Sequence, residues 1–165
     1  MRSCFRTNVP GDHDAAEYLV IGQLMRRNIL AYKALPQNEG YDLICIHPNP
    51  RKKTKVVRIQ VKSRYQTDSN RSVFVSEGSF SAFDFLVMVF LNIGWYYDPK
   101  CKDPIEGRRE TEYFVLPRSI AKRLYYKVKS GMNRIRTEGK NLDRYKNENG
   151  WELIADALAV EYPKP

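Results

Sequence analysis

The most apolar segment of the chain runs from Phe83 to Tyr97 and contains the sequence FDFLVMVFL. It is too short to cross a membrane as a helix, and it carries Asp84 and Asn92 among its apolar residues. A short apolar run rich in Phe and Val is typical of a buried β-strand. We therefore expect a sheet with this strand in its core and no membrane association.

Size and composition agree with such a core. With 165 residues, 42% hydrophobic and 12% aromatic, the chain is expected to form one globular domain over residues 1–165. Its first residues, MRSCFRTNVPGDHD, lack the apolar centre of a signal peptide. Cys4, Cys45 and Cys101 are odd in number and lack CxxC spacing, so neither a disulfide framework nor a structural zinc site is indicated. We expect an intracellular protein, cytoplasmic or nucleoid-associated.

Helical and strand patterns alternate along the chain. Apolar residues at helical spacing predict a first helix over residues 15–28. The segments ILAYKAL, YDLICI and VVRIQVKS then predict a meander of three strands, separated by a Gly turn and a basic loop. Further strands are expected at SVFVS, FDFLVMVFL and TEYFVL, followed by a basic helix at RSIAKRLYYKVKS and a short helix at WELIADAL.

The net charge indicates a class of partner. The chain carries 28 Lys and Arg residues against 19 Asp and Glu, a formal charge of +9. Such a balance favours polyanions, which release counterions when basic side chains neutralise their phosphates. Nucleic acid is therefore the leading partner class, and a basic solvated surface is the alternative.

The segment RIQVKSR, residues 58–64, has an unusually polar side for a strand. Its alternation places four polar or basic residues together: Arg58, Gln60, Lys62 and Arg64. Asp42 lies eighteen positions before Gln60, in a strand expected to pair antiparallel with this one. With that pairing, the side chains of Asp42 and Gln60 can project to the same side.

Glu17 adds a third polar group. It lies at the centre of the apolar stripe that Val20, Ile21 and Leu24 form on the first helix, so it points toward the sheet. A carboxylate left unpaired there is costly. A metal ion, a lysine or a polar site is the expected compensation.

The sequence resembles the PD-(D/E)xK nuclease superfamily, in its variant with QxK in place of ExK. The resemblance rests on the order of three features: Glu17 on a helix, Asp42 in a strand, and the Gln60-Val61-Lys62 motif in the next strand. The variant is also seen in a homing endonuclease of this fold, and Holliday junction resolvases have a similar fold. The resemblance implies an α/β (α+β), restriction-endonuclease-like core with a central mixed sheet of about four to five strands flanked by helices.

The resemblance covers roughly residues 17–91 and has two departures. Tyr41 stands where the superfamily usually has proline before the aspartate. No crossover helix is evident in residues 66–82, between the QxK strand and the next core strand. The second departure affects the expected topology more than the expected site.

The resemblance also implies roles for four catalytic residues. Asp42, Gln60 and the backbone carbonyl of Val61 would hold Mg²⁺ or Mn²⁺, which prefers hard oxygen ligands. Lys62 would stabilise charge at the phosphate, and Glu17 would assist as an outer-shell or water-mediated ligand. Gln60 supplies an oxygen without a charge, so weaker metal binding is expected than with a carboxylate.

Each of these residues has a structural alternative. Asp14 and Glu17 have the spacing of a helix capping box. Asp42 follows Gly40 and suits a turn that enters a strand. Gln60 and Lys62 suit the solvated face of an antiparallel strand.

Further polar residues near the motif are expected to contact nucleic acid. A basic loop before the motif strand is a candidate clamp, and residues within and after the strand could reach backbone phosphates. These candidates are Arg51, Lys52, Lys53, Lys55, Arg58, Ser63, Arg64 and Gln66.

The expected function is hydrolysis of DNA phosphodiester bonds by a divalent-metal-dependent endonuclease, with no other small-molecule cofactor. Cutting both strands of a duplex requires two sites, so a homodimer or larger assembly is expected. Two alternatives stay open: a non-catalytic nucleic-acid-binding module with a decayed site, and an RNA-directed nuclease on the same fold.

Overall fold

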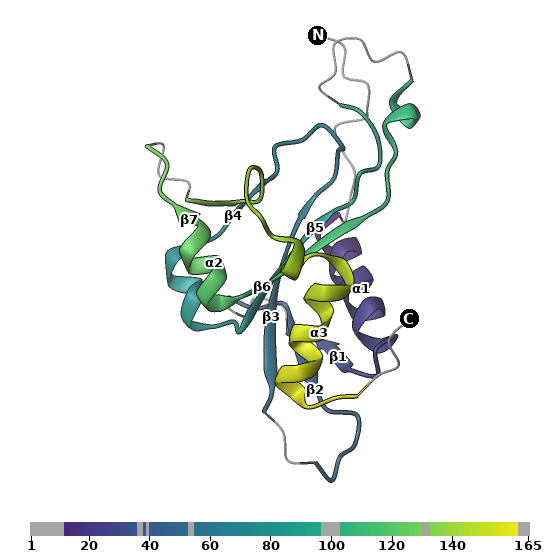
Figure 1. The fold of residues 1–165 in the computed structure, drawn as a ribbon, viewed down its shortest axis with the longest axis vertical. Helices are drawn as coiled ribbons and strands as arrows, with labels where there is room; N and C mark the ends of the chain where they lie inside the picture. Colours follow the sequence, from purple (N-terminus) through teal and green to yellow (C-terminus); the bar gives the residue numbers. More distant parts are fainter. Residues whose placement is uncertain are drawn as a thin grey trace.

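The structure is a computed structural model that describes residues 12–35, 38, 40–52, 55–96, 103–129 and 133–161. Figure 1 shows the helices and strands that these ranges form. In chain order they are α1 (Asp12–Met25), β1 (Leu30–Lys33), β2 (Leu43–Ile46), β3 (Val57–Arg64), β4 (Ser72–Phe74), the 3-10 helix η1 (Glu77–Ser81), β5 (Phe85–Phe90), η2 (Pro104–Gly107), β6 (Glu112–Pro117), α2 (Arg118–Leu124), β7 (Tyr125–Tyr126), β8 (Arg134–Arg136), η3 (Asp143–Tyr145) and α3 (Asn147–Leu158).

A five-stranded mixed sheet forms the centre, in the order β1-β2-β3-β5-β6. Strands β1, β2 and β3 form the antiparallel meander that the sequence predicts. Strand β5 then runs parallel to β3, with Val61 opposite Val87, and β6 is antiparallel to β5. The fold class expected from the sequence, an α+β protein with a central mixed sheet, is confirmed.

The connection from β3 to β5 contains no α-helix. Parallel neighbours need a crossover, and here β4 and η1 supply it. The absence of an α-helix between residues 66 and 82 is therefore a real feature of the topology. Strand β4 leaves the main sheet and joins β8 and β7 in a second sheet, ordered β4-β8-β7, which we call the small sheet.

Both faces of the central sheet are covered. On one face, α1 and α3 contribute Leu24 and Trp151 to a cluster that includes Val61 and Val87. On the other, η1, α2 and the small sheet cover alternate residues of the same strands, Met88 among them. All six residues of β5 are buried, because side chains on both sides of this strand meet a covering layer.

All three α-helices differ from their predicted ranges: α3, predicted at WELIADAL, begins four residues earlier, at Asn147. The helix predicted for residues 15–28 begins at Asp12 and ends at Met25, and Asn28 adopts a positive φ of 59° before the chain enters β1. The helix predicted over residues 118–130 is wrong after Leu124, where the chain turns into β7. Aromatic residues favour a strand when a partner is present, and β8, which the sequence analysis missed, provides it.

Across the described ranges, the structure has no helix of the length and apolar character needed to cross a membrane.

Candidate active site

A glycine turn positions Asp42. Gly40 has a φ of 84°, and a Cβ added to it would lie 2.5 Å from the Cβ of Ala82. The chain then passes between β1 and β3: the Asp42 N–H donates to the Ile59 carbonyl at 2.8 Å, and the Ala34 N–H donates to the Asp42 carbonyl at 2.7 Å. Asp42 is therefore fixed through its backbone just before β2 begins.

The Asp42 carboxylate contacts the backbone of the QxK motif. Its Oδ2 accepts a hydrogen bond from the Val61 N–H at 2.6 Å. The register of β2 and β3 pairs Leu43 with Ile59, so one step further places Asp42 opposite Gln60. The pairing expected from the sequence brings these two residues together.

Gln60 is the most unusual residue of the motif. It is only 7% exposed, and its Oε1 is buried without a hydrogen-bond partner. A buried acceptor left unsatisfied costs about 1–3 kcal/mol. The alternative that Gln60 belongs to a solvated strand face is therefore wrong. Lys62, two residues further along β3, lies on the same side and is partly buried.

Glu17 is paired with a lysine that the sequence analysis did not single out. Lys33, at the end of β1, places its Nζ 2.9 Å from the Glu17 carboxylate and 2.7 Å from that of Asp14. These hydrogen bonds from Lys33 to Asp14 and Glu17 raise the pKa of the Lys33 ammonium above its ordinary value. Of the three expected compensations for Glu17, the structure provides a lysine.

Glu17 and Asp42 share one cleft of about 250 Å³. Its lining includes three carboxylates, Asp14, Glu17 and Asp42, and the single ammonium of Lys33. These charged groups make the cleft negative, although the chain as a whole has a net charge of +9. A negative cleft suits a cation.

The described residues contain no group of three His, Cys, Asp or Glu side chains that could hold a metal ion together. A metal here would depend on a mixed set of oxygens from Asp42, Gln60 and the Val61 backbone. The unpartnered Oε1 of Gln60, next to the strand position that Asp42 contacts, fits such a set.

The other predicted contact residues lie in different settings. Arg51, Lys52 and Lys55 are exposed in the loop between β2 and β3, and Lys53 lies outside the described residues. The Arg58 guanidinium lies 5.6 Å from the centroid of the Tyr41 ring.

The side chains of two predicted contact residues near the end of β3, Ser63 and Arg64, are directed toward the protein. The Ser63 hydroxyl is buried and has no partner, so it does not face a surface ligand. The Nε of Arg64 donates to the Ser72 carbonyl of β4 at 2.7 Å. The part-buried Gln66 carbonyl accepts a hydrogen bond from the Ser69 hydroxyl at 2.7 Å.

An ion pair beside the motif strand also escaped the sequence analysis. The Asp84 carboxylate, just before β5, accepts two hydrogen bonds. The Arg58 N–H donates one at 2.9 Å, and the Arg118 Nη2 donates the other at 2.7 Å. Arg118 also donates from its Nε to the Phe83 carbonyl. These bonds fix the start of β3 against β5 and α2, and sequence spacing gives no signal for them.

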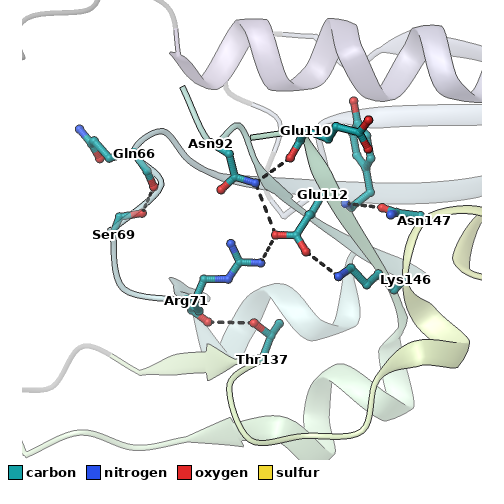
Figure 2. A network of polar contacts seen from close by, with 10 residues as sticks. Gln66, Ser69, Arg71, Asn92, Glu110, Glu112, Thr137, Lys146 and Asn147 are labelled. Carbon is teal, nitrogen blue, oxygen red and sulfur yellow. Dashed lines mark hydrogen bonds and ion pairs between the residues drawn. The ribbon is translucent and has the colours of Figure 1, made fainter. Parts of the chain in front are cut away.

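A larger hollow of about 410 Å³ lies beyond the ends of β3 and β5, lined by Arg71, Asn92, Glu112 and Lys146 among others. Its central carboxylate, Glu112, is already bonded to Arg71 and Lys146, as Figure 2 shows. We therefore place the candidate active site at the smaller cleft, because its Asp42 is bonded to Val61, the residue next to Gln60, whose buried Oε1 has no partner.

Comparison with solved structures shows which fold this is. A bacterial homing endonuclease, I-Ssp6803I, has a TM-score of 0.52 and 18% sequence identity, over 93% of this chain and 94% of that chain. The Holliday junction resolvase Hjc of Archaeoglobus fulgidus has a TM-score of 0.45 and 11% identity, over 91% of this chain and 98% of that one. Models of known families and sequences of curated proteins gave no match.

The chain thus shares its fold with a homing endonuclease, in agreement with the nuclease-like fold that its motif residues predict. At this level of identity, the likeness concerns the fold alone. The chemistry must be argued from the residues that the fold brings together.

Proposed function

We propose that this chain is a divalent-metal-dependent endonuclease that hydrolyses phosphodiester bonds of DNA. The observation that carries the proposal is the bond of the Asp42 carboxylate to the backbone N–H of Val61, the residue next to Gln60, whose buried Oε1 has no partner. The fold that this chain shares with a homing endonuclease supports the proposal.

The proposed roles follow from the chemistry of each group. Asp42, Gln60 and the carbonyl of Val61 would hold Mg²⁺ or Mn²⁺, which when bound supplies Lewis acidity and an acidified water. The Lys62 ammonium stabilises negative charge that develops on the phosphate. Glu17, which lines the same cleft as Asp42, adds negative charge that Gln60 lacks.

The cleavage test uses substitutions that preserve shape. Asp42→Asn keeps an acceptor for the Val61 N–H but removes the charge, and Lys62→Met keeps the length of the side chain. We expect each to reduce cleavage of supercoiled plasmid or branched DNA in Mg²⁺ or Mn²⁺ by about 100-fold or more. DNA binding measured in EDTA should change little.

Matched controls remove the same charges elsewhere. Asp156 on α3 and Lys140 are exposed, and Asp156→Asn and Lys140→Met should cleave as the native chain does. Activity that survives both Asp42→Asn and Lys62→Met would place the chemistry elsewhere. Cleavage of an RNA oligonucleotide in preference to DNA would favour the RNA-directed alternative.

A second candidate function is a nucleic-acid-binding module without catalysis. It is favoured by one observation: among the described residues, Asp42 is the only carboxylate bonded to the motif strand's QxK segment, and Glu17 is held by Lys33. Titration with Mn²⁺ separates the two functions, because a decayed site should bind the ion no better than Asp42→Asn does.

Gln60 itself provides a further prediction about this metal. Gln60→Glu replaces the neutral oxygen with a charged one, so Mn²⁺ should bind more tightly, measured by calorimetric titration. Gln66→Glu, in the loop after β3, is a control for the added charge. Unchanged Mn²⁺ affinity in Gln60→Glu would show that this side chain does not face the ion.

A further inference from the structure

The positive charge of the chain is concentrated in one segment. Residues 118–146 contain ten Lys or Arg residues and two acidic residues, a net of +8, while the whole chain carries +9. This segment forms α2, β7, β8 and η3. It does not include the basic loop before β3 that the sequence analysis proposed as a clamp.

The small sheet of this segment has one buried and one open face. Val73, Ile135 and Tyr125 lie in register across β4, β8 and β7, and they pack on the hydrophobic cluster that covers the central sheet. The alternate residues of these strands lie on the opposite face, where Phe74 and Arg136 are exposed, Arg134 and Tyr126 are partly exposed and Ser72 is buried. We call this the outer face of the small sheet.

A row on the outer face places an arginine between two aromatic residues. Phe74, Arg134 and Tyr126 are opposite one another across the three strands. Phe74 is 48% exposed, which is high for a large apolar side chain in a strand. Arg136 lies next in β8, with its guanidinium 5.8 Å from the centroid of the Tyr126 ring.

Few carboxylates neutralise these arginines. Arg134 donates to the Ser72 hydroxyl at 3.2 Å, and no described acidic side chain forms an ion pair with it. Arg136 meets Glu138 at 3.9 Å, and both side chains are about half exposed. A surface pair at that distance is weak and leaves Arg136 able to bind an anion.

A polar network holds the small sheet in place (Figure 2). Arg71, just before β4, bonds to Glu112 of β6 through its guanidinium. Its carbonyl accepts the N–H and the hydroxyl of Thr137, which follows β8. Lys146, just before α3, bonds to the other oxygen of Glu112. These bonds therefore fix the orientation of the small sheet, and so of its outer face, relative to the central sheet.

The small sheet also borders the motif strand. Strand β4 contacts β3, and the Arg64 Nε donates to the Ser72 carbonyl at 2.7 Å. Arg64 lies two residues after Lys62, on the same side of β3. The outer face therefore belongs to a sheet that borders the strand carrying the QxK motif.

We propose that the outer face of the small sheet binds a nucleic-acid strand, with Arg134 and Arg136 on its phosphates and Phe74 stacked on an exposed base. Arginine neutralises phosphates, and an exposed aromatic ring stacks on unpaired bases. The inference rests on the proposed function and adds a substrate class to it: DNA with single-stranded character. Duplex DNA keeps its bases stacked inside and offers none to Phe74.

The test measures binding in EDTA, so that cleavage plays no part. Fluorescence anisotropy reports the affinity for a labelled single strand and for the duplex of the same sequence, over a series of salt concentrations. The variants are Phe74→Ala, Phe74→Trp and the double variant Arg134→Gln with Arg136→Gln. The charge-matched control is Arg26→Gln with Arg108→Gln, because Arg26 and Arg108 are exposed and lie outside the small sheet.

We expect Phe74→Ala to weaken single-strand binding about 5- to 100-fold and duplex binding less, with Phe74→Trp close to native. Loss of two phosphate contacts should make the salt slope for single strands shallower by about 1.4 in the double arginine variant. The control should keep the native slope. Equal losses in the control, or an unchanged affinity in the small-sheet variants, would overturn the proposal.

The outcome is independent of the cleavage result. A chain that cuts DNA through Asp42 and Lys62, yet binds it equally well without Phe74, Arg134 and Arg136, would keep the proposed function and lose this inference. A chain that cuts nothing but needs these three residues for single-strand binding would keep the inference and lose the endonuclease. Absence of any nucleic-acid binding would overturn both.

Discussion

At the scale of single residues, the candidate site is defined by which of its polar atoms have a hydrogen-bond or ion-pair partner. Gln60 has a buried oxygen with no partner, whereas Glu17 has a lysine. The motif predicts both positions from the sequence, since strand alternation and helix periodicity fix their sides. Lys33 could not be predicted, because its contact with Glu17 joins β1 to α1 only after the helix has packed.

Lys33 and a divalent ion would compete for the charge of Glu17. Lys33→Met keeps the length of the side chain and removes the ammonium, which also lies 4.9 Å from the centroid of the Tyr18 ring. We expect Mn²⁺ affinity to rise about twofold to fivefold, because the ion no longer competes with a partly exposed ion pair, and such pairs are weak. Calorimetric titration measures it, with Lys140→Met as control. A weaker affinity would mean that Lys33 supports the metal site.

The single described cysteine gives a prediction about reactivity. Burial raises the pKa of the Cys45 thiol in β2 to about 12. In a Cys4→Ser, Cys101→Ser background, we expect Cys45 to resist a thiol reagent at pH 8 in native protein and to react after unfolding in urea, because the thiolate is the reactive form. Rapid reaction in the native state would show that β2 opens to solvent.

At the scale of elements, strands were predicted better than helix ends and short pairings. The long apolar segment identified β5, because a strand buried on both faces needs apolar residues at nearly every position. The stretch after Leu124 was predicted as helix, since its apolar spacing suits one. Pairing with β8, distant in sequence, makes it a strand instead.

The turn before β2 provides a test at this scale. Gly40→Ala forces a side chain into a positive φ and against Ala82, so we expect a loss of about 1–3 kcal/mol in the free energy of unfolding. Gly22→Ala is the matched control: Gly22 lies in α1 with open space around it, and alanine there should stabilise by about 1 kcal/mol. Urea unfolding measures both. Equal effects would mean that the turn is not under steric constraint.

At the scale of the whole molecule, the Glu112 network joins both sheets and α3. Burial raises the pKa of Glu112, but its hydrogen bonds to Lys146 and Arg71 lower it by more, so the net pKa lies below the ordinary value. A carboxylate with a depressed pKa stabilises the fold above its unfolded pKa, and this contribution is lost as the pH falls through the folded pKa.

Glu112→Gln should therefore destabilise the protein in a pH-dependent way. We expect a loss of about 1–3 kcal/mol at pH 7, because two cations lose their charged acceptor. The difference from native protein should shrink as the pH falls from the ordinary glutamate pKa of about 4.3 toward the lower pKa of native Glu112. Urea unfolding across this pH range measures it, with exposed Glu110→Gln as control. A difference independent of pH would assign the effect to packing.

The sequence by itself determined the order of the central strands along the chain, the helix-borne Glu17 and the pairing of Asp42 with the QxK motif. These depend on local periodicity and on strands adjacent in sequence, which leave a direct trace in the residues. Only the tertiary structure decided the small sheet, the pairing of Glu17 with Lys33 and the gathering of positive charge beside the motif strand. Those contacts join residues far apart in sequence, and they are selected by the packing of layers on both faces of the sheet.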